Sequence, residues 1–210
     1  ADGGLVHLQK LGLTPHGIIG DFDSLGYVPD NAQVFPVEKD DTDTMLCLRH
    51  GLALGFEDFR VVGGFGGRLD HTLANFQTLN FAASLGTRAE MRDELNCATV
   101  IRGGSVSVPR RPGKLSVFAL DTECRGVCVR GAKYEVEDAV LTSAFPLGMG
   151  NDFSDDAAEI SVCDGALLVI AYKRGRRQDV KEVVESINNT GCPVLGSVLN
   201  NVDLSSFANR

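Results

Sequence analysis

The sequence lacks both a long apolar run and an excess of basic residues. No stretch approaches the roughly 20 apolar residues that span a membrane, so we expect no membrane partner. The 20 lysines and arginines are outnumbered by 28 aspartates and glutamates, which gives a formal net charge of −8. Because nucleic-acid binding usually needs a basic face, this charge argues against a nucleic-acid partner. An acidic chain that handles phosphates has to recruit a metal cation, since carboxylates repel phosphate.

The cysteine pattern lacks the spacing of a metal or redox motif. The six cysteines form no C-x-x-C pair. Cys124 and Cys128 are four residues apart, but no further Cys or His lies close to them in the sequence. The N-terminus also lacks the basic and apolar segments of a secretory signal. These absences favour a cytoplasmic protein with reduced, mostly buried thiols over a zinc site.

The hydrophobic pattern of the first part of the chain is that of an α/β domain. A length of 210 residues favours one large or two small domains. Residues 1–86 alternate short apolar runs with helical spacing. Residues 17–20 predict a buried strand, 34–37 an edge strand and 45–52 a helix. This alternation predicts a parallel sheet covered by helices.

The pattern changes twice after residue 86. Residues 87–170 have a period of two, which predicts short strands joined by turns, one of them at 102–104. Such spacing favours a β-sandwich or a small barrel. Residues 171–210 contain a helical stripe and then an apolar run, which predicts an appended helix-strand tail. We therefore expect three parts, with boundaries near residues 86 and 170.

An acidic turn follows the first predicted strand. Residues 20–24 have the sequence GDFDS, directly after the apolar residues of that strand. Ligands of open α/β sheets bind beyond the carboxyl ends of the strands. If the backbone stays extended, Asp21 and Asp23 point the same way and suit a hard cation with oxygen ligands. An Asp-rich solvent turn is the alternative interpretation.

A second group of charges opens the predicted helix. Residues 39–43 have the sequence KDDTD, in which Asp41 or Thr42 is available as the N-cap. Capping and the helix dipole alone would favour acids there. Lys39 beside the acids is harder to explain in that way. Nucleotide chemistry needs a cation that can bind phosphate beside carboxylates that can hold Mg²⁺.

A glycine-rich loop joins another strand to a helix. Residues 63–71 have the sequence GGFGGRLDH. Glycines let the backbone approach phosphate oxygens, and a helix N-terminus adds backbone N–H donors. The planar guanidinium of Arg68 can bind a phosphate or a carboxylate. A plain linker is the alternative, and His71 alone would be a structural histidine. The spacing fits neither the Walker loop nor the Rossmann fingerprint.

Together these motifs resemble thiamine pyrophosphokinase over residues 1 to about 170. The four matching segments, in the family's order, are ADGG at 1–4, GDFDS at 20–24, KDDTD at 39–43, and GGFGGRLDH at 63–71 with Ala74 and Asn75. The resemblance implies an α/β nucleotide-binding domain at 1–86 and a thiamine-binding β-sandwich domain at 87–170. It also implies a homodimer with thiamine bound between subunits, and transfer of a diphosphoryl group from ATP to the thiamine hydroxyl with release of AMP.

The resemblance further implies roles for individual residues. Asp21, Asp23 and Asp43 would hold Mg²⁺ on the ATP phosphates, as part of a catalytic set that includes Asp70. Lys39 and Arg68 would neutralise charge on the transferred group, and Asp70 would position substrate or accept the hydroxyl proton. The other expected substrate contacts are Asp40, Thr42, His71, Asn75 and Asn151. For this site to exist, the acidic turns and the glycine-rich loop have to converge.

The sequence departs from the family pattern in three places. The family normally has a strand, a glycine turn and a helix before ADGG. Its S-N-E pattern is replaced by GMGND at 148–152, which keeps Asn151 without the serine hydroxyl. Residues 171–210 continue past the usual end of the family. From about 164 to 210 the chain resembles the C-terminal part of a bacterial P-loop tyrosine kinase, and a fusion of the two families is one interpretation.

Two other functions remain open beside a thiamine diphosphokinase. One is a catalytically impaired nucleotide-binding or regulatory module. The other is an interaction module formed by the tyrosine-kinase-like tail, which lacks the Walker motifs needed for kinase activity. Formation of AMP only with Mg²⁺ and thiamine would favour the first function, and binding without product would favour the regulatory module.

Overall fold

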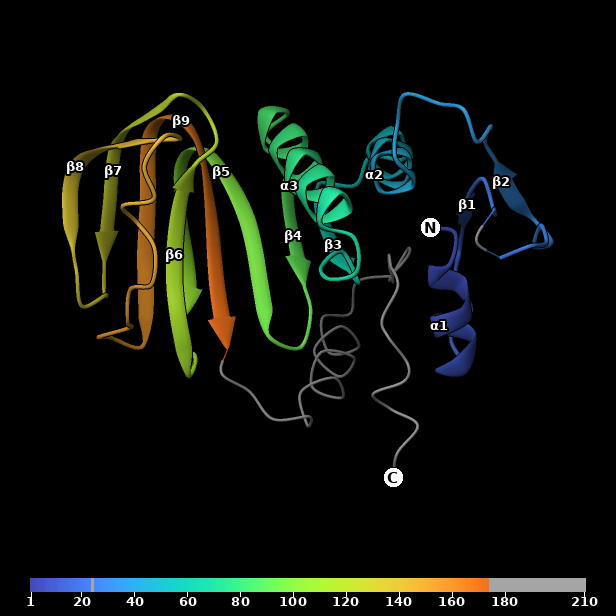
Figure 1. Ribbon diagram of the computed structural model, residues 1–210, viewed down its shortest axis with the longest axis horizontal. Helices are drawn as coiled ribbons and strands as arrows, with labels where there is room; N and C mark the ends of the chain where they lie inside the picture. The colour runs from blue at the N-terminus through green and yellow to red at the C-terminus, as the bar shows by residue number, and fades with distance from the viewer. Residues whose placement is uncertain (24, 174–210) are drawn as a thin grey trace.

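The computed structural model describes residues 1–23 and 25–173, arranged as helices beside a large β-sheet (Figure 1). In chain order the elements are α1 (Gly4–Lys10), β1 (Ile18–Gly20), β2 (Ala32–Val34), α2 (Asp43–Ala53), β3 (Asp58–Val62), α3 (Leu69–Ser84), β4 (Arg88–Arg92), β5 (Asn96–Pro109), β6 (Gly113–Ala119), β7 (Glu123–Arg130), β8 (Val136–Thr142) and β9 (Ala157–Lys173). The predicted edge strand at 34–37 therefore lies earlier, at β2. The tail predicted at 171–210 lies almost wholly outside the described residues.

The strands form one small sheet and one large sheet. β1 and β2 are a parallel pair. The seven-stranded sheet has the order β3-β4-β5-β9-β7-β8, with β6 also paired to β9. Within it β3 and β4 are parallel, whereas the pairs formed by the later strands are antiparallel. The predicted α/β class is confirmed, and the fold has one large, mixed sheet.

Strand β9 is buried on both faces and separates two hydrophobic cores. Leu167, Val169 and Ala171 belong to a core formed among the strands. Ala166 and Leu168 belong to a second core, which also contains residues of α2 and α3. Side chains of a strand alternate between its two faces, so a strand covered on both sides becomes a continuous apolar run. The sequence of β9 between 166 and 171 has this composition.

Strand β5 bends where a turn was predicted. Residues 102–104 do not end the strand, because both halves of β5 pair with β9 across a register shift between Arg102 and Gly104. Gly103 and Gly104 have φ angles of 68° and 81°, a conformation that glycine adopts without steric strain. The glycines therefore make a β-bulge in one long strand rather than a turn between two strands. Strand β9 likewise runs without a break from Ala157 to Lys173.

The two longer helices begin as the sequence predicts. The Thr42 hydroxyl accepts a hydrogen bond from the backbone N–H of Met45, so Thr42 is the N-cap of α2. Helix α3 packs Leu79 and Ala82 against the sheet, where both are almost completely buried.

No helix in the described part of the chain is long and apolar enough to cross a membrane. The boundaries proposed near residues 86 and 170 stay a prediction, and the sheet continues from β3 and β4 into β5 across the first of them.

Candidate active site

The start of the chain lies against the end of β1. The backbone N–H of Asp2 donates a hydrogen bond of 3.0 Å to the carbonyl of Ile19. Gly20 makes this approach possible, because a Cβ atom there would lie 3.1 Å from the Cβ of Asp2. The carboxylate of Asp2 is thereby placed beside the acidic turn that follows β1.

The acidic turn is held by a buried phenylalanine in a strained conformation. Phe22 is only 3% exposed and has a φ angle of 62°, in the left-handed region that bulky residues rarely adopt. The backbone N–H of Asp23 donates to Oδ1 of Asp21 across this turn, at 3.3 Å. The backbone is therefore not extended between Asp21 and Asp23, although their carboxylates still lie close together. Such strain persists where the surroundings impose it, often at functional sites.

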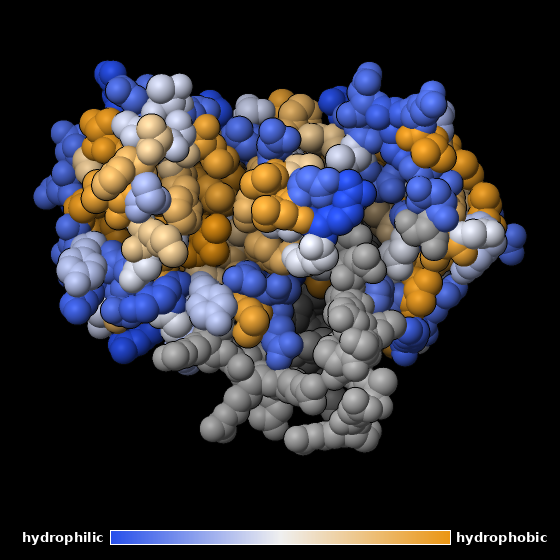
Figure 2. All heavy atoms as spheres, in the orientation of Figure 1, coloured by the Kyte–Doolittle hydropathy of each residue, from blue (hydrophilic) through white to orange (hydrophobic). Residues whose placement is uncertain are grey.

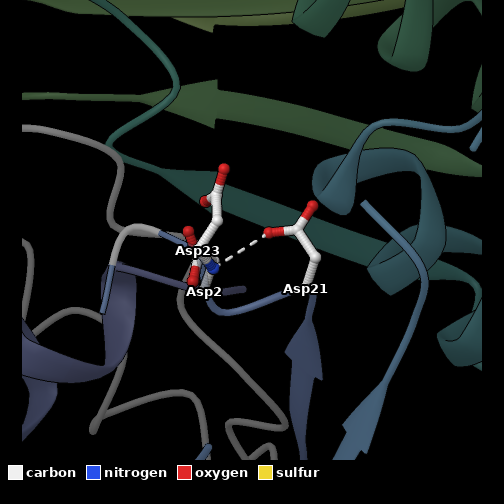
Figure 3. Close-up of side chains that lie close together, drawn as sticks. All are labelled: Asp2, Asp21 and Asp23. Atoms are coloured by element: carbon white, nitrogen blue, oxygen red, sulfur yellow. Dashed lines mark hydrogen bonds between the residues drawn. The ribbon is translucent and has the colours of Figure 1, made fainter. Parts of the chain in front are cut away.

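Three carboxylates meet at this turn. Oxygen atoms of Asp2, Asp21 and Asp23 all lie within 4.8 Å of one another (Figure 3). The Oδ1 atom of Asp2 is buried and has no hydrogen-bond partner among the described residues. A buried carboxylate oxygen without a partner is unfavourable, and like charges at this distance repel. Hard cations such as Mg²⁺ prefer a set of oxygen donors of this kind, so the residues present fit the implied metal.

Lys39 joins this cluster to the N-terminus of α2. Its Nζ lies 2.5 Å from Oδ2 of Asp21 and 2.9 Å from Oδ1 of Asp43. The Lys39 side chain is 13% exposed, and those of Asp21 and Asp43 are 12% and 23% exposed. Asp21 and Asp43 therefore lie on either side of Lys39, and Asp23 lies beside Asp21. We call Asp2, Asp21, Asp23, Lys39 and Asp43 the acidic cluster.

The pKa values of the residues in the acidic cluster are shifted in opposite directions. The hydrogen bond from Lys39 is the main reason that the pKa of Asp21 is lowered. Burial raises the pKa of Asp43, and the charges of Asp21 and Asp2 add to that effect, against the opposing influence of Lys39. Burial would lower the pKa of Lys39, but its hydrogen bonds to both carboxylates raise it overall. Lys39 is thus held as a cation among carboxylates.

The role of Asp2 was not predicted from the sequence. Asp2 belongs to the ADGG segment on which the family resemblance rests, but it was not among the expected site residues. Asp2 is the one acidic residue of that segment, and the acidic turn that it meets lies almost 20 residues later. Only the contact between Asp2 and Ile19 brings the two segments together.

The glycine-rich loop is fixed to the sheet by its first glycines. Nδ2 of the buried Asn75 donates to the carbonyl of Gly64 at 2.9 Å. A Cβ on Gly64 would lie 2.3 Å from Sδ of Met91, so a side chain there would clash. Gly66 and Gly67 follow with φ angles of 82° and 62°. Asn75, predicted to bind substrate, is seen here to hold the loop that precedes α3.

Arg68 and Asp70 form an exposed pair at the start of α3. Nε and Nη2 of Arg68 donate to the two carboxylate oxygens of Asp70, at 3.1 and 2.5 Å. The backbone N–H of His71 donates to Oδ1 of Asp70, and the hydrogen bond from Arg68 is the main reason that the pKa of Asp70 is lowered. These hydrogen bonds lie within residues 68–71, and none of them reaches the acidic cluster. Its convergence with that cluster stays a prediction.

The remaining expected residues lie in two other places. Asp40 is exposed on the segment before α2, and Thr42 caps that helix. Asn151 lies on the long connection after β8, where its Oδ1 accepts from the backbone N–H of Tyr134 and its Nδ2 donates to the Tyr134 carbonyl. In the described part of the chain, the side-chain bonds of Asn151 therefore order this connection. The substrate contacts of all three residues stay predictions.

Comparison with known proteins finds similarity to the family that the sequence motifs resemble. Residues 1–90 match the family model described as thiamin pyrophosphokinase, catalytic domain. The thiamine pyrophosphokinase of Bacillus subtilis is 25% identical over 179 residues, which cover 80% of this chain and 84% of that protein. The predicted function and enzyme class are confirmed by these similarities. The comparisons do not show the predicted resemblance of the tail to tyrosine kinases.

Solved structures described as thiamine pyrophosphokinases have a similar fold. The crystal structure of the Bacillus subtilis thiamine pyrophosphokinase superposes with a TM-score of 0.75 at 24% identity, over 83% of this chain and 86% of that one. A thiamin pyrophosphokinase family protein from Enterococcus faecalis has a TM-score of 0.69 at 29% identity, over 83% of this chain and 87% of that one. The family-model match at 1–90 contains every residue of the acidic cluster.

Proposed function

We propose that this chain is a thiamine pyrophosphokinase that transfers a diphosphoryl group from ATP to the hydroxyl of thiamine and releases AMP. The acidic cluster is the observation that carries the proposal, because carboxylates from two separate segments meet around one lysine. Phosphoryl transfer requires mostly positioning and stabilisation of a spread negative charge. The cluster combines the two kinds of group that provide this, metal-binding carboxylates and a cation.

Asp2, Asp21 and Asp23 are the residues that would hold Mg²⁺. Their oxygens lie close enough together to share one ion, and Asp2 Oδ1 is buried without a hydrogen-bond partner in the described chain. Bound there, the ion would supply charge neutralisation to the ATP phosphates. Asp43, the third ligand expected from the sequence, lies across Lys39 from Asp21 and outside the group of three carboxylates.

Lys39 and Arg68 are the cations proposed to contact the transferred group. In the structure Lys39 neutralises Asp21 and Asp43, so its Nζ is already positioned beside the carboxylates. Arg68 is exposed at the end of the glycine-rich loop, and its planar fork suits bidentate contact with a phosphate. The thiamine oxygen forms a bond to the β-phosphorus of ATP, the bond from that phosphorus to the α,β-bridging oxygen breaks, and AMP leaves with that oxygen.

Asp70 is proposed to orient Arg68 and substrate rather than to accept the hydroxyl proton. Both carboxylate oxygens of Asp70 accept hydrogen bonds from Arg68, and its pKa is lowered mainly for this reason. A carboxylate with a lowered pKa is a poor general base near neutral pH. A loose phosphoryl-transfer transition state needs little help from a base, so the hydroxyl proton can pass to water.

The proposal includes a two-domain homodimer in the cytoplasm. Residues 1–86 would be the parallel-sheet nucleotide-binding domain, residues 87–170 the β-sandwich domain for thiamine, and residues 171–210 an appended tail. Apolar side chains gather on the face of the β-rich part drawn toward the viewer in Figure 2. Phe145, Leu147 and Met149 are each more than 60% exposed on the connection after β8. An exposed apolar patch of this kind supports a second copy as partner.

One incubation tests the activity. The full chain is mixed with ATP, Mg²⁺ and thiamine, and the nucleotide products are separated. We expect AMP and thiamine diphosphate in equal amounts, and no AMP when either Mg²⁺ or thiamine is omitted. Formation of ADP instead of AMP would contradict diphosphoryl transfer and indicate a kinase or ATPase. Binding of ATP without any product would also contradict diphosphoryl transfer and would indicate a nucleotide-binding module.

A further inference from the structure

A second charged site lies on the face of the sheet opposite α3. On β4, Ala89 and Met91 pack into the core beneath the helices, so the residues between them point to the other face. A cavity of about 220 Å³ opens there. Its charged wall on β3 and β4 is formed by Arg60, Arg88, Glu90 and Arg92.

The bend in β5 provides the opposite wall. Cys97 and Thr99, from the first half of β5, line the cavity together with Val106 and Val108 from the second half. Because residues from both sides of the bulge at 103–104 face the same space, the second half of β5 turns over the first. Arg111, on the turn after β5, adds a fourth guanidinium to the lining.

The arginines of the cavity are not balanced by acids. Nε of Arg92 lies 2.9 Å from Oε1 of Glu90, which accounts for one positive charge. Within residues 1–23 and 25–173, Arg60, Arg88 and Arg111 form no ion pair with any side chain. Three uncompensated cations therefore border one small space, in a chain whose formal net charge is −8. Like charges in one cleft repel, and a multivalent anion between them would remove that repulsion.

The apolar part of the lining strengthens the attraction of an anion. Val108 and Val169 are both buried, and both also line the cavity. Low-dielectric walls focus the field of nearby charges. The volume is below the roughly 300 Å³ at which pockets for drug-sized ligands begin, so it suits a phosphate or diphosphate group better than a whole nucleotide. Guanidinium forks match phosphate oxygens in geometry as well as in charge.

From these observations the geometry points to a binding site for a phosphate or diphosphate group between Arg60, Arg88 and Arg111. None of the residues of the acidic cluster lines this cavity. The site therefore does not depend on the proposed transfer reaction, and it binds its anion without Mg²⁺. Inorganic diphosphate and inorganic phosphate are the two simplest sources of this chemistry.

Titration calorimetry of the full chain with inorganic diphosphate tests the site, in buffer without Mg²⁺, thiamine or ATP. We expect saturable binding that is tighter for diphosphate than for phosphate, because the larger anion can engage more than one arginine. Arg60→Gln, Arg88→Gln and Arg111→Gln should each weaken diphosphate binding by about tenfold or more. Arg110→Gln is the matched control: Arg110 is adjacent to Arg111 and exposed, but it bonds the carbonyl of Ser154 and does not line the cavity.

The outcomes separate this site from the proposed active site. Wild-type affinity in Asp21→Asn, with loss in the arginine variants, supports a separate anion site. No binding beyond that of chloride at equal ionic strength would overturn it. Equal losses in Arg110→Gln and in the three cavity variants would also overturn it, by showing a general charge effect. Calorimetry without Mg²⁺ gives these results whether or not the chain forms AMP.

Discussion

The acidic cluster and the arginine-lined cavity show two ways of gathering charge in one chain. In the acidic cluster, Lys39 neutralises only part of the charge of four carboxylates, so a net negative charge remains. In the cavity, only Arg92 has an acidic partner among the described residues. The first site thus holds part of its counter-charge itself and takes the rest from a cation, whereas the second takes its counter-charge from an anion. The charge balance within a site, and not the net charge of the chain, therefore indicates what the site will bind.

Asp21→Asn gives the largest expected effect. Replacing this carboxylate removes both a metal ligand and the partner of Lys39, so kcat/KM for AMP formation should fall by about 100-fold or more. Asp30→Asn, an exposed position on the turn before β2, should leave the rate unchanged. A near-normal rate in Asp21→Asn would remove the acidic cluster from the proposed mechanism.

Lys39→Gln tests whether the acidic cluster depends on its internal cation. Without Lys39, the half-buried carboxylates of Asp21 and Asp43 lose their shared partner. We expect the free energy of unfolding to fall by about 1–3 kcal/mol in urea denaturation. Lys114→Gln is the control, because its pair with Asp152 is roughly half exposed and should be worth less than about 1 kcal/mol. Equal losses in the two variants would contradict a special role for Lys39.

The stability that Asp21 supplies should depend on pH. Its folded-state pKa is lowered, mainly by the hydrogen bond from Lys39, so the unfolded chain binds more protons at acid pH. The contribution is therefore complete above the unfolded pKa of about 4 and is lost as the pH falls through the folded value. The difference in unfolding free energy between wild type and Asp21→Asn should be constant near neutrality and shrink below that pH. A constant difference down to the acid limit would contradict the ion pair.

Arg88→Gln has the smallest expected effect on stability, with the opposite sign to that of Lys39→Gln. It removes one of three unbalanced cations, so without an anion the free energy of unfolding should rise, by up to about 0.5 kcal/mol. The gain should vanish in high salt, which screens the repulsion. Arg125→Gln, which loses an exposed pair with Glu123, should show no gain. A clear loss of stability in Arg88→Gln would break the contrast between the two sites.

Local sequence signals predicted the acidic cluster better than they predicted the large sheet. Asp21, Asp23, Lys39 and Asp43 lie in short segments whose composition is unusual for a plain turn or helix start, so their chemistry was visible before their positions were known. The contact of Asp2 with Ile19 and the left-handed turn at Phe22 depend on packing between distant segments. No local pattern contains that information.

The arginine-lined cavity escaped prediction for a related reason. Arg60, Arg88 and Arg111 are separated by more than 20 residues each, and they meet only because β3 pairs with β4 and β5 turns back. The glycines at 103–104 were recognised, but a pair of glycines suits both a turn and a bulge. The pairing with β9 decides between the two, and it involves residues about 60 positions away.

Calorimetric titration of Mg²⁺ into the full chain measures directly whether the acidic segments together hold one divalent ion. We expect a single saturable site, with affinity reduced by about tenfold or more in each of Asp2→Asn, Asp21→Asn and Asp23→Asn, because even residues that only support a metal ligand cost tenfold or more when changed. Asp30→Asn should bind as wild type does. Unchanged affinity in Asp2→Asn and Asp21→Asn would show that these carboxylates do not hold the ion.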